Sequence, residues 1–401
     1  MPRYNGGFIG TDGLDAPDAP VSVTPTIGNA QVSVAFTDVG GGTTDTTSFV
    51  VQVSTDGTDY SAGSATGSSS PIVVSSLSNG TAYTAKAWAI NDNGTSAPSV
   101  ASSSFTPSEL AGNVIYFAGG GDNVIEFRNV ASTGNSSDFG DLTSTSEGGN
   151  GTASSTRGVF AKGKNASGES RDIDYVTLVT AGNATDFGDT TYQRTVLGSL
   201  GNDTRGIFAG GALSSDRVNV IDYITIASTG NATDFGNLQE TKRGVGAAGS
   251  TTRGLFFGGD INGSTYSNNI DRIEIASTGN AANFGDLSAT RNNPVGVSSN
   301  TRAIACVGSD GSGNAVNILE YVTIASLGNV TDFGDATVAK DTAAGDGCGT
   351  LGIIGGGYAS SANTNVIESI TIASTGNASD FGDLLAAKKE LGAFSSAHGG
   401  L

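Results

Sequence analysis

The chain has 401 residues, of which 37% are hydrophobic and 61 are glycine, and its formal net charge is −19. A chain this acidic repels a phosphate backbone, which argues against nucleic acid as a partner. No apolar run approaches the roughly 18 residues of a membrane-spanning helix, so membrane insertion is not expected. The apolar residues instead form short, regularly spaced clusters between turn-forming residues, a pattern that predicts an all-β fold.

Residues 1–18 are rich in Gly, Asp and Pro and hold one aromatic cluster, which includes Tyr4 and Phe8. The segment is too short to bury a core, and we expect it to be an arm that anchors the protein through these two aromatic side chains. It lacks the apolar stretch of a secretory signal, which predicts synthesis in a cytosol without export by the secretory route.

Residues 19–107 contain short apolar runs separated by turn signals, at spacings that predict a β-sandwich. The runs lie at 21–23, 31–36, 49–53, 72–74 and 83–90. The segment 77–83, the alternating alanines that follow it and the turn at 91–94 resemble the E–F corner and F strand of fibronectin type III domains. This resemblance implies that Tyr83 closes a tyrosine corner, whereas Phe36 stands where the family usually has Trp.

Trp88 is the only tryptophan of the chain. Because side chains alternate along a strand, Tyr83, Ala85, Ala87 and Ala89 share one face and Trp88 points to the other. We therefore expect Trp88 to lie outside the sandwich core. Either Lys86 or a neighbouring strand shields it, or it contacts the following domain or another subunit.

A linker at 108–112 leads to a repetitive region that covers residues 113–401. Its marker is a Gly-Asn turn followed by Phe-Gly, and the Phe recurs at intervals of 48 or 49 residues. The six copies are Phe139, Phe187, Phe235, Phe284, Phe333 and Phe381. A period near 50 residues is typical of propeller blades, so six copies predict a six-bladed β-propeller.

Each copy is predicted to contain four strands, A to D, for example at 205–209, 220–226, the Phe-Gly segment and 244–248. Apolar strands that end in a Gly-Gly pair resemble the kelch repeat, although the kelch Trp is absent. The segment 391–394 is predicted to give the sixth blade its own strand D, so that closure needs no strand from the beginning of the region, unless the blade phase is offset.

An acid occupies one point of strand B in every copy, and the six acids are Glu126, Asp174, Asp222, Asp271, Glu320 and Glu368. Strand A carries Arg157, Arg205, Arg253 and Arg302 in four of the copies. Two interpretations follow. The acids pair with these arginines across adjacent strands and are structural, or the ring of six acids binds a cation.

The sequence does not predict an enzyme. His398 is the single histidine, which argues against a His-based triad or a His-rich metal site. Asp-Phe-Gly recurs without the other kinase motifs and is interpreted as a repeat turn. Cys306 and Cys348 are expected to be buried thiols. We expect no metal and no cofactor.

The loops differ in how much they vary between copies. The B–C segment, Ala-Ser-Thr-Gly-Asn, hardly varies, whereas the A–B and C–D loops vary in length and content. A uniform face suits scaffolding and a varied face suits recognition, although drift without selection would also vary the loops. On the varied face, aromatic and polar side chains suited to sugars are Tyr192, Arg194, Asp260, Asn262, Tyr266 and Tyr358.

Residues 4–10, Tyr-Asn-Gly-Gly-Phe-Ile-Gly, resemble the opening of structural proteins from tailed bacteriophages, notably marine and cyanobacterial ones. Repeats of the type Ala-Ser-Thr-Gly-Asn-Ala-Thr-Asp-Phe-Gly-Asp-Leu resemble the propeller repeats of their tail-fibre and appendage proteins. The resemblance implies a virion protein, assembled in the host cytoplasm and exposed on the particle, whose arm binds other virion proteins.

Three functions follow from these expectations. The first is a tail fibre or receptor-binding adhesin that recognises host surface glycan, as an oligomer of undetermined order. The second is a purely structural capsid decoration or a tail or baseplate connector. The third, a glycan-degrading enzyme, needs paired carboxylates in a cleft, whereas the acids here repeat with the scaffold.

Overall fold

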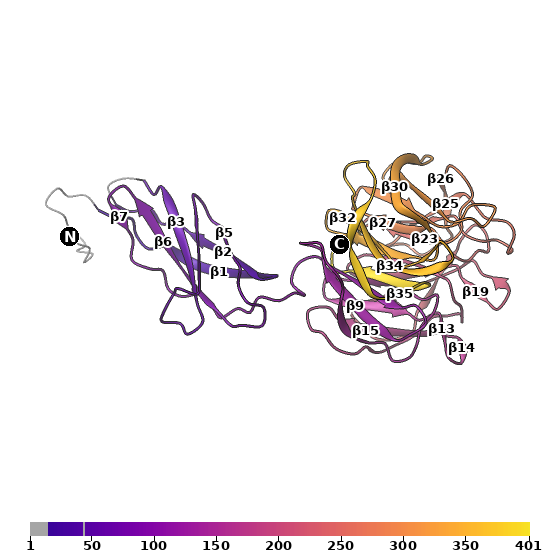
Figure 1. Ribbon diagram of the computed structural model, residues 1–401, viewed down its shortest axis with the longest axis horizontal. Coiled ribbons are helices and arrows are strands. Elements are labelled where there is room, and N and C mark those ends of the chain that lie inside the picture. The colour runs from indigo at the N-terminus through magenta and orange to yellow at the C-terminus, as the bar shows by residue number, and fades with distance from the viewer. Residues whose placement is uncertain (1–14, 43–44) are drawn as a thin grey trace. The chain divides into compact units, whose positions relative to one another are not determined.

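The structure is a computed structural model that describes residues 15–42 and 45–401 (Figure 1). The regular elements in these ranges are β-strands joined in antiparallel sheets, which confirms the all-β class. No helix within the described ranges is long and apolar enough to cross a membrane. The chain divides into two compact units, called here unit 1 (residues 1–112) and unit 2 (residues 113–401). The predicted anchor residues Tyr4 and Phe8 lie outside the described residues.

Unit 1 consists of two sheets. One contains, in spatial order, β1 (Val21–Gly28), β2 (Gln31–Thr37) and β5 (Ile72–Ser75). The other contains β4 (Gly63–Gly67), β3 (Ser48–Ser54), β6 (Thr84–Asn91) and β7 (Gly94–Thr95). Along β6, Ala85, Ala87 and Ala89 are buried and the residues between them are half-buried, so one face of the sheet packs on the core.

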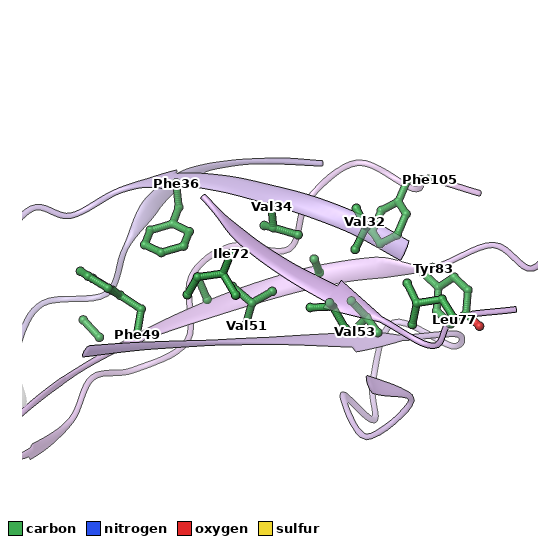
Figure 2. Packing of buried hydrophobic residues seen from close by; sticks show 14 residues of the cluster. Val32, Val34, Phe36, Phe49, Val51, Val53, Ile72, Leu77, Tyr83 and Phe105 are labelled. Atoms are coloured by element: carbon green, nitrogen blue, oxygen red, sulfur yellow. The ribbon is translucent and has the colours of Figure 1, made fainter. Parts of the chain in front are cut away.

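The core of unit 1 lies between these two sheets (Figure 2). Val34 and Phe36 on β2 face residues of the other sheet, and the rings of Phe36 and Phe49 are 4.9 Å apart. Each large apolar side chain buried in this way contributes about 1.5–3 kcal/mol. At one end, the backbone N–H of Ser78 donates to the Tyr83 hydroxyl at 3.1 Å, which satisfies the polar end of a buried ring.

Unit 2 contains six sheets of four or five strands, each named by a Roman numeral. Sheet I is β36 (Leu391–Ser395), β8 (Val114–Gly119), β9 (Val124–Asn129) and β10 (Ser137–Asp141). Sheet II is β11 (Asn150–Ala153), β12 (Arg157–Ala161), β15 (Asp172–Thr177) and β16 (Thr185–Asp189). Sheet III is β17 (Gly198–Gly201), β18 (Arg205–Ala209), β21 (Val220–Thr225) and β22 (Thr233–Asn237).

The remaining sheets continue the pattern. Sheet IV is β23 (Gly246–Gly249), β24 (Arg253–Phe257), β25 (Asn269–Glu274) and β26 (Ala282–Asp286). Sheet V is β27 (Val295–Ser298), β28 (Arg302–Cys306), β29 (Val316–Thr323) and β30 (Thr331–Lys340). Sheet VI is β31 (Ala344–Cys348), β32 (Leu351–Gly355), β34 (Ala362–Thr371) and β35 (Ser379–Lys388), with β33 (Tyr358–Ala359) also paired to β34. Short hairpins in the loops are β13 (Lys164–Asn165) with β14 (Gly168–Glu169), and β19 (Ala212–Leu213) with β20 (Asp216–Arg217).

The grouping of strands corrects one expectation. Strand D of each copy pairs with strand A of the next copy, so it belongs to the following sheet. For the last copy the next strand A is β8, and Leu391 on β36 is paired with Gly119 on β8. The expectation that the sixth copy keeps its own strand D is therefore wrong. A periodic sequence is unchanged when the grouping of its strands is shifted, so the period alone does not fix which strands share a sheet.

The first strands of the six sheets contact one another in the order β36, β11, β17, β23, β27 and β31, and β31 contacts β36 again. These strands, called here the inner strands, approach closely because many of their residues are small. A Cβ on Gly296 would overlap the carbonyl of Ala247 in the preceding sheet, and one on Gly347 would overlap that of Ser298. Apolar clusters fill the remaining space between neighbouring sheets, as Phe235 of sheet III and Phe256 of sheet IV illustrate.

The two repeated motifs form a clamp between neighbouring sheets. The backbone N–H of Gly230 donates to the carbonyl of Phe187 at 2.8 Å, and the Asn231 side chain accepts from the backbone N–H of Asp189 at 3.0 Å. Gly188 has a φ of +142°, and a Cβ there would lie 2.6 Å from the carbonyl oxygen of Gly230. The Gly-Asn turn of one sheet and the Phe-Gly strand of the preceding sheet are thus complementary.

The same clamp joins sheet I to sheet VI. The Gly134 N–H donates to the carbonyl of Phe381 at 2.7 Å, and Asn135 accepts from the backbone of Asp383 at 3.1 Å. All six copies of the Gly-to-Phe hydrogen bond are present. The uniform residues of the repeat are therefore explained by contacts within unit 2.

Candidate functional site

Unit 2 has two sets of connections at opposite ends of its strands. The turn face carries the Gly-Asn turns and the A-strand entries. The loop face carries the A–B loops and the C–D loops that lead from one sheet to the next. Because the sheets are antiparallel, each set lies at one end of the strands.

The six repeated acids are buried, each with at most 3% of its surface exposed. Each is paired with a lysine or arginine at 2.8–3.4 Å. The pairs are Glu126–Lys388, Asp174–Lys162, Asp222–Arg194, Asp271–Lys242, Glu320–Arg291 and Glu368–Lys340. Burial lowers the pKa of Arg194, Arg291 and Lys340, and the adjacent carboxylate opposes that shift.

The expected partners of these acids were the strand-A arginines, and this expectation is wrong. Arg205 lies over the ring of Tyr223 at 4.6 Å and donates to the carbonyl of Ile275 in the next sheet at 2.8 Å. Arg157 and Arg302 make the equivalent contacts with Tyr175 and Tyr321. In the strand register Arg205 is opposite Thr225, whereas Asp222 is opposite Phe208, so the two charges are not neighbours.

The true cations carry a signal that the sequence reasoning missed. Arg194, Lys242, Arg291, Lys340 and Lys388 recur at intervals of 48 or 49 residues. At the remaining position stands Ser146, and there Lys162, which follows β12, supplies the charge instead, 3.4 Å from Asp174. Every acid has a basic partner, which favours the structural interpretation of the acids over cation binding. No group of three or more His, Cys, Asp or Glu residues is placed to hold a metal within the described residues.

Two of the predicted ligand-binding residues are used by the fold. Arg194 is buried against Asp222 at 2.8 Å. Asp260 is also buried, and its carboxylate accepts from Arg217 at 2.6 Å and Arg243 at 3.1 Å. Burial alone would raise the pKa of Asp260, but these hydrogen bonds and that from Gly263 lower it. Neither side chain is available to an external ligand.

The other four lie at the surface of the loop face. Tyr192 is 37% exposed and Tyr358 is 39% exposed. Asn262 is exposed and Tyr266 is half-buried. No ring contact joins two of these tyrosines among the residues described, and their loops belong to different sheets. The structure therefore leaves them accessible without gathering them into one aromatic cluster.

On the loop face, one residue just before each inner strand contributes to a ring, called here the mouth. The sequence did not reveal this ring. Its six residues all have φ between +48° and +64°, and they are Gly148, Val196, Gly244, Asn293, Thr342 and Glu390. Backbone N–H groups donate from one to the carbonyl of another, for example from Val196 to Gly148 at 2.7 Å and from Gly148 to Glu390 at 2.8 Å. The mouth surrounds a concavity of about 70 Å³.

Two titratable side chains, those of Asp346 and His398, line the narrow space between the inner strands. Asp346 on β31 lines this space, and burial raises its pKa well above the usual value. At the turn-face end, the Gly400 N–H donates to Nδ1 of His398 at 3.1 Å. The Nε2 atom therefore carries the proton and donates to the carbonyl of Ala153 at 2.7 Å. Burial lowers the pKa of His398.

In unit 1, Trp88 lies on the face of β6 opposite the buried alanines and is half-buried. Its ring meets that of Tyr60 edge-on at 6.4 Å. The Lys86 ammonium lies 4.6 Å from the centre of the Tyr60 ring. Tyr60 therefore covers part of Trp88, and Lys86 lies over Tyr60 and not over Trp88.

Comparison with known proteins identifies no relative of this chain. No protein-family model matches the chain, and no curated protein sequence matches it.

Proposed function

We propose that unit 2 is a six-bladed, kelch-like β-propeller and that unit 1 is a fibronectin type III-like sandwich. The cyclic contacts of the inner strands and the clamp between sheets VI and I support the propeller. The hydrogen bond from Ser78 to the Tyr83 hydroxyl supports the fibronectin-like corner.

On this architecture we propose that the protein is a virion component of a tailed bacteriophage. It acts as a tail fibre or receptor-binding adhesin, and its loop face binds glycan on the host surface. One observation carries the proposal. The uniform turn-face residues are used in the clamp, whereas Tyr192, Asn262 and Tyr358 of the varied loop face are exposed and not needed by it. The arm with Tyr4 and Phe8 would attach the protein to the particle.

Adsorption of the purified full chain to bacterial cells tests this function. We expect binding that soluble surface polysaccharide inhibits and that the combined substitutions Tyr192→Ala, Asn262→Ala and Tyr358→Ala abolish. Thr229→Ala with Thr278→Ala, at exposed turn-face positions, is the matched control and is expected to bind like the wild type. Lack of adsorption, together with labelling of the capsid shell or baseplate by an antibody to the chain, would favour the decoration or connector role instead.

A further inference from the structure

A chain of charged and aromatic side chains borders the mouth on one side. Glu390 belongs to the mouth itself, and Glu147, which precedes Gly148, is close enough to influence its charge. The Lys164 ammonium lies 3.4 Å from Glu147, and the Lys389 ammonium lies 3.7 Å from Glu390. Lys389 is also 5.3 Å from the centre of the Tyr358 ring. These five residues are called here the mouth cluster.

The mouth cluster is locally balanced in charge although the chain as a whole carries −19. Two neighbouring carboxyl groups are flanked by two ammonium groups, so the cluster offers both hydrogen-bond donors and acceptors. Burial, and then the neighbouring Glu147, raise the pKa of Glu390. The two carboxyl groups would repel an anionic sugar, and the two lysines would repel a sugar that carries an ammonium group.

A neutral sugar is repelled by neither the carboxyl groups nor the lysines. Its hydroxyl groups both donate and accept, and the C–H face of its ring packs on an exposed aromatic side chain such as Tyr358. The concavity of about 70 Å³ is far below the ~300–1,000 Å³ of pockets that enclose a whole ligand. It suits the end of a glycan chain better than an internal segment.

We propose that the mouth cluster binds the terminal neutral hexose of a surface polysaccharide, with the sugar ring against Tyr358 and its hydroxyls on Glu390, Glu147 and Lys389. This proposal rests on the adhesin function proposed above and assigns its binding site. It also distinguishes Tyr358, which belongs to the mouth cluster, from the other exposed tyrosine, Tyr192, which does not.

A glycan array tests the proposal with the full chain. The array carries bacterial polysaccharides and oligosaccharides that end in glucose, galactose or mannose, in glucuronate, or in glucosamine with a free amino group. We expect retention on one or more neutral-hexose termini and on neither charged class. Tyr358→Ala and Glu390→Gln should each weaken that binding about tenfold or more, because each removes one well-placed contact. Tyr358→Phe, which keeps the ring, should bind like the wild type.

Thr229→Ala with Thr278→Ala, at exposed turn-face positions, is the control. It should keep wild-type affinity, and thermal melting should show that every variant is folded. The mouth assignment is overturned, with the adhesin function intact, if the wild type binds and Tyr358→Ala and Glu390→Gln both bind as well as it does, or if charged termini are preferred. If the wild type is retained by none of the saccharides, the adhesin function itself is overturned.

Discussion

At the residue scale, each repeated acid is paired with a buried cation, and in one copy that cation comes from a different sequence position. Five cations occupy the same position of the repeat, whereas in the first copy Ser146 stands there and Lys162 reaches Asp174 from the neighbouring strand. The Ser146 hydroxyl donates to the carbonyl of Lys162 at 2.6 Å, which ties the two positions together. The fold thus requires a cation beside each buried acid. The cation can come from either of two sequence positions.

This substitution pattern predicts that the cation of Asp174 can be relocated. Lys162→Ala leaves a buried carboxylate without its cation and should lower the free energy of unfolding by about 3–5 kcal/mol. Adding Ser146→Lys to Lys162→Ala should restore most of that loss, because five other copies hold their cation there. Urea unfolding of the single and double variants measures both. A double variant no more stable than the single one would contradict the rule.

Asp346 gives a second prediction at this scale, on pH. No basic side chain pairs with it in the part of the chain that the structure describes, and burial raises its pKa. The folded state therefore binds more protons than the unfolded state, and stability falls as the pH rises above about 4 and through the raised pKa. Asp346→Asn removes this titration and should stabilise the protein at pH 8, by roughly 1.4 kcal/mol for each unit of the shift.

Urea unfolding midpoints of the wild type and Asp346→Asn at pH 4, 6 and 8 check this expectation. The difference between the two proteins should be small at pH 4 and largest at pH 8. Exposed Asp234→Asn serves as the control and should show no such trend. A difference that does not change with pH would mean that the carboxyl group is not the cause.

At the element scale, the strands themselves were predictable and their grouping was not. The predicted strand at 205–209 is β18 (Arg205–Ala209), and that at 220–226 agrees with β21 (Val220–Thr225) within one residue. Alternation and apolar clusters decide these strands locally. Which strands share a sheet depends on contacts between copies, which a regular period does not reveal.

The candidate site was less predictable for the same reason. The varied loops pointed to Tyr358 and Tyr192, but neither the burial of Asp260 nor the mouth could be read from residue types. Asp260 is held by arginines from two other segments, and the mouth joins residues from all six sheets. The mouth positions recur at the repeat interval of 48 or 49 residues, but six different sequence contexts occupy them, so residue type does not mark them.

The clamp provides the prediction at the element scale. Gly188→Ala places a methyl group about 2.6 Å from the carbonyl oxygen of Gly230, at a φ of +142° that alanine rarely adopts. We expect it to cost about 1–3 kcal/mol of stability. Gly230→Ala is the informative control, because a Cβ there meets nothing within 4 Å, although its φ of +152° is also unfavourable. Thermal unfolding should therefore place Gly188→Ala below Gly230→Ala.

At the scale of the whole molecule, β36 joins the end of unit 2 to its beginning. Residues on β36 pair with β8, and Phe394 stacks on Tyr116 at 5.2 Å. Removing residues 391–401 would leave one edge of β8 unpaired and would expose the apolar cluster between sheets I and VI.

We expect this truncation to destabilise the whole of unit 2 and not sheet I alone, because sheets II to VI share one continuous set of contacts. Hydrogen exchange should rise in all six sheets, and unfolding should become less cooperative. The substitution Phe394→Ala is the milder companion and should lower stability by about 3–5 kcal/mol. Exchange that rises only in β8, β9 and β10 would show instead that the sheets are stable independently.

The pairing of β36 with β8 also sets the order of events during synthesis. The apolar strand Val114–Gly119 leaves the ribosome long before its partner Leu391–Ser395 has been made. At 5–20 residues per second, the interval is roughly 15–55 s. Throughout that time, one edge of a strand rich in aromatic and β-branched residues has no native partner and is exposed to pairing with other nascent chains. The ring is thus completed after translation of its final strand, and the delay makes the yield of folded protein sensitive to the rate of elongation and to chaperones that cover this edge.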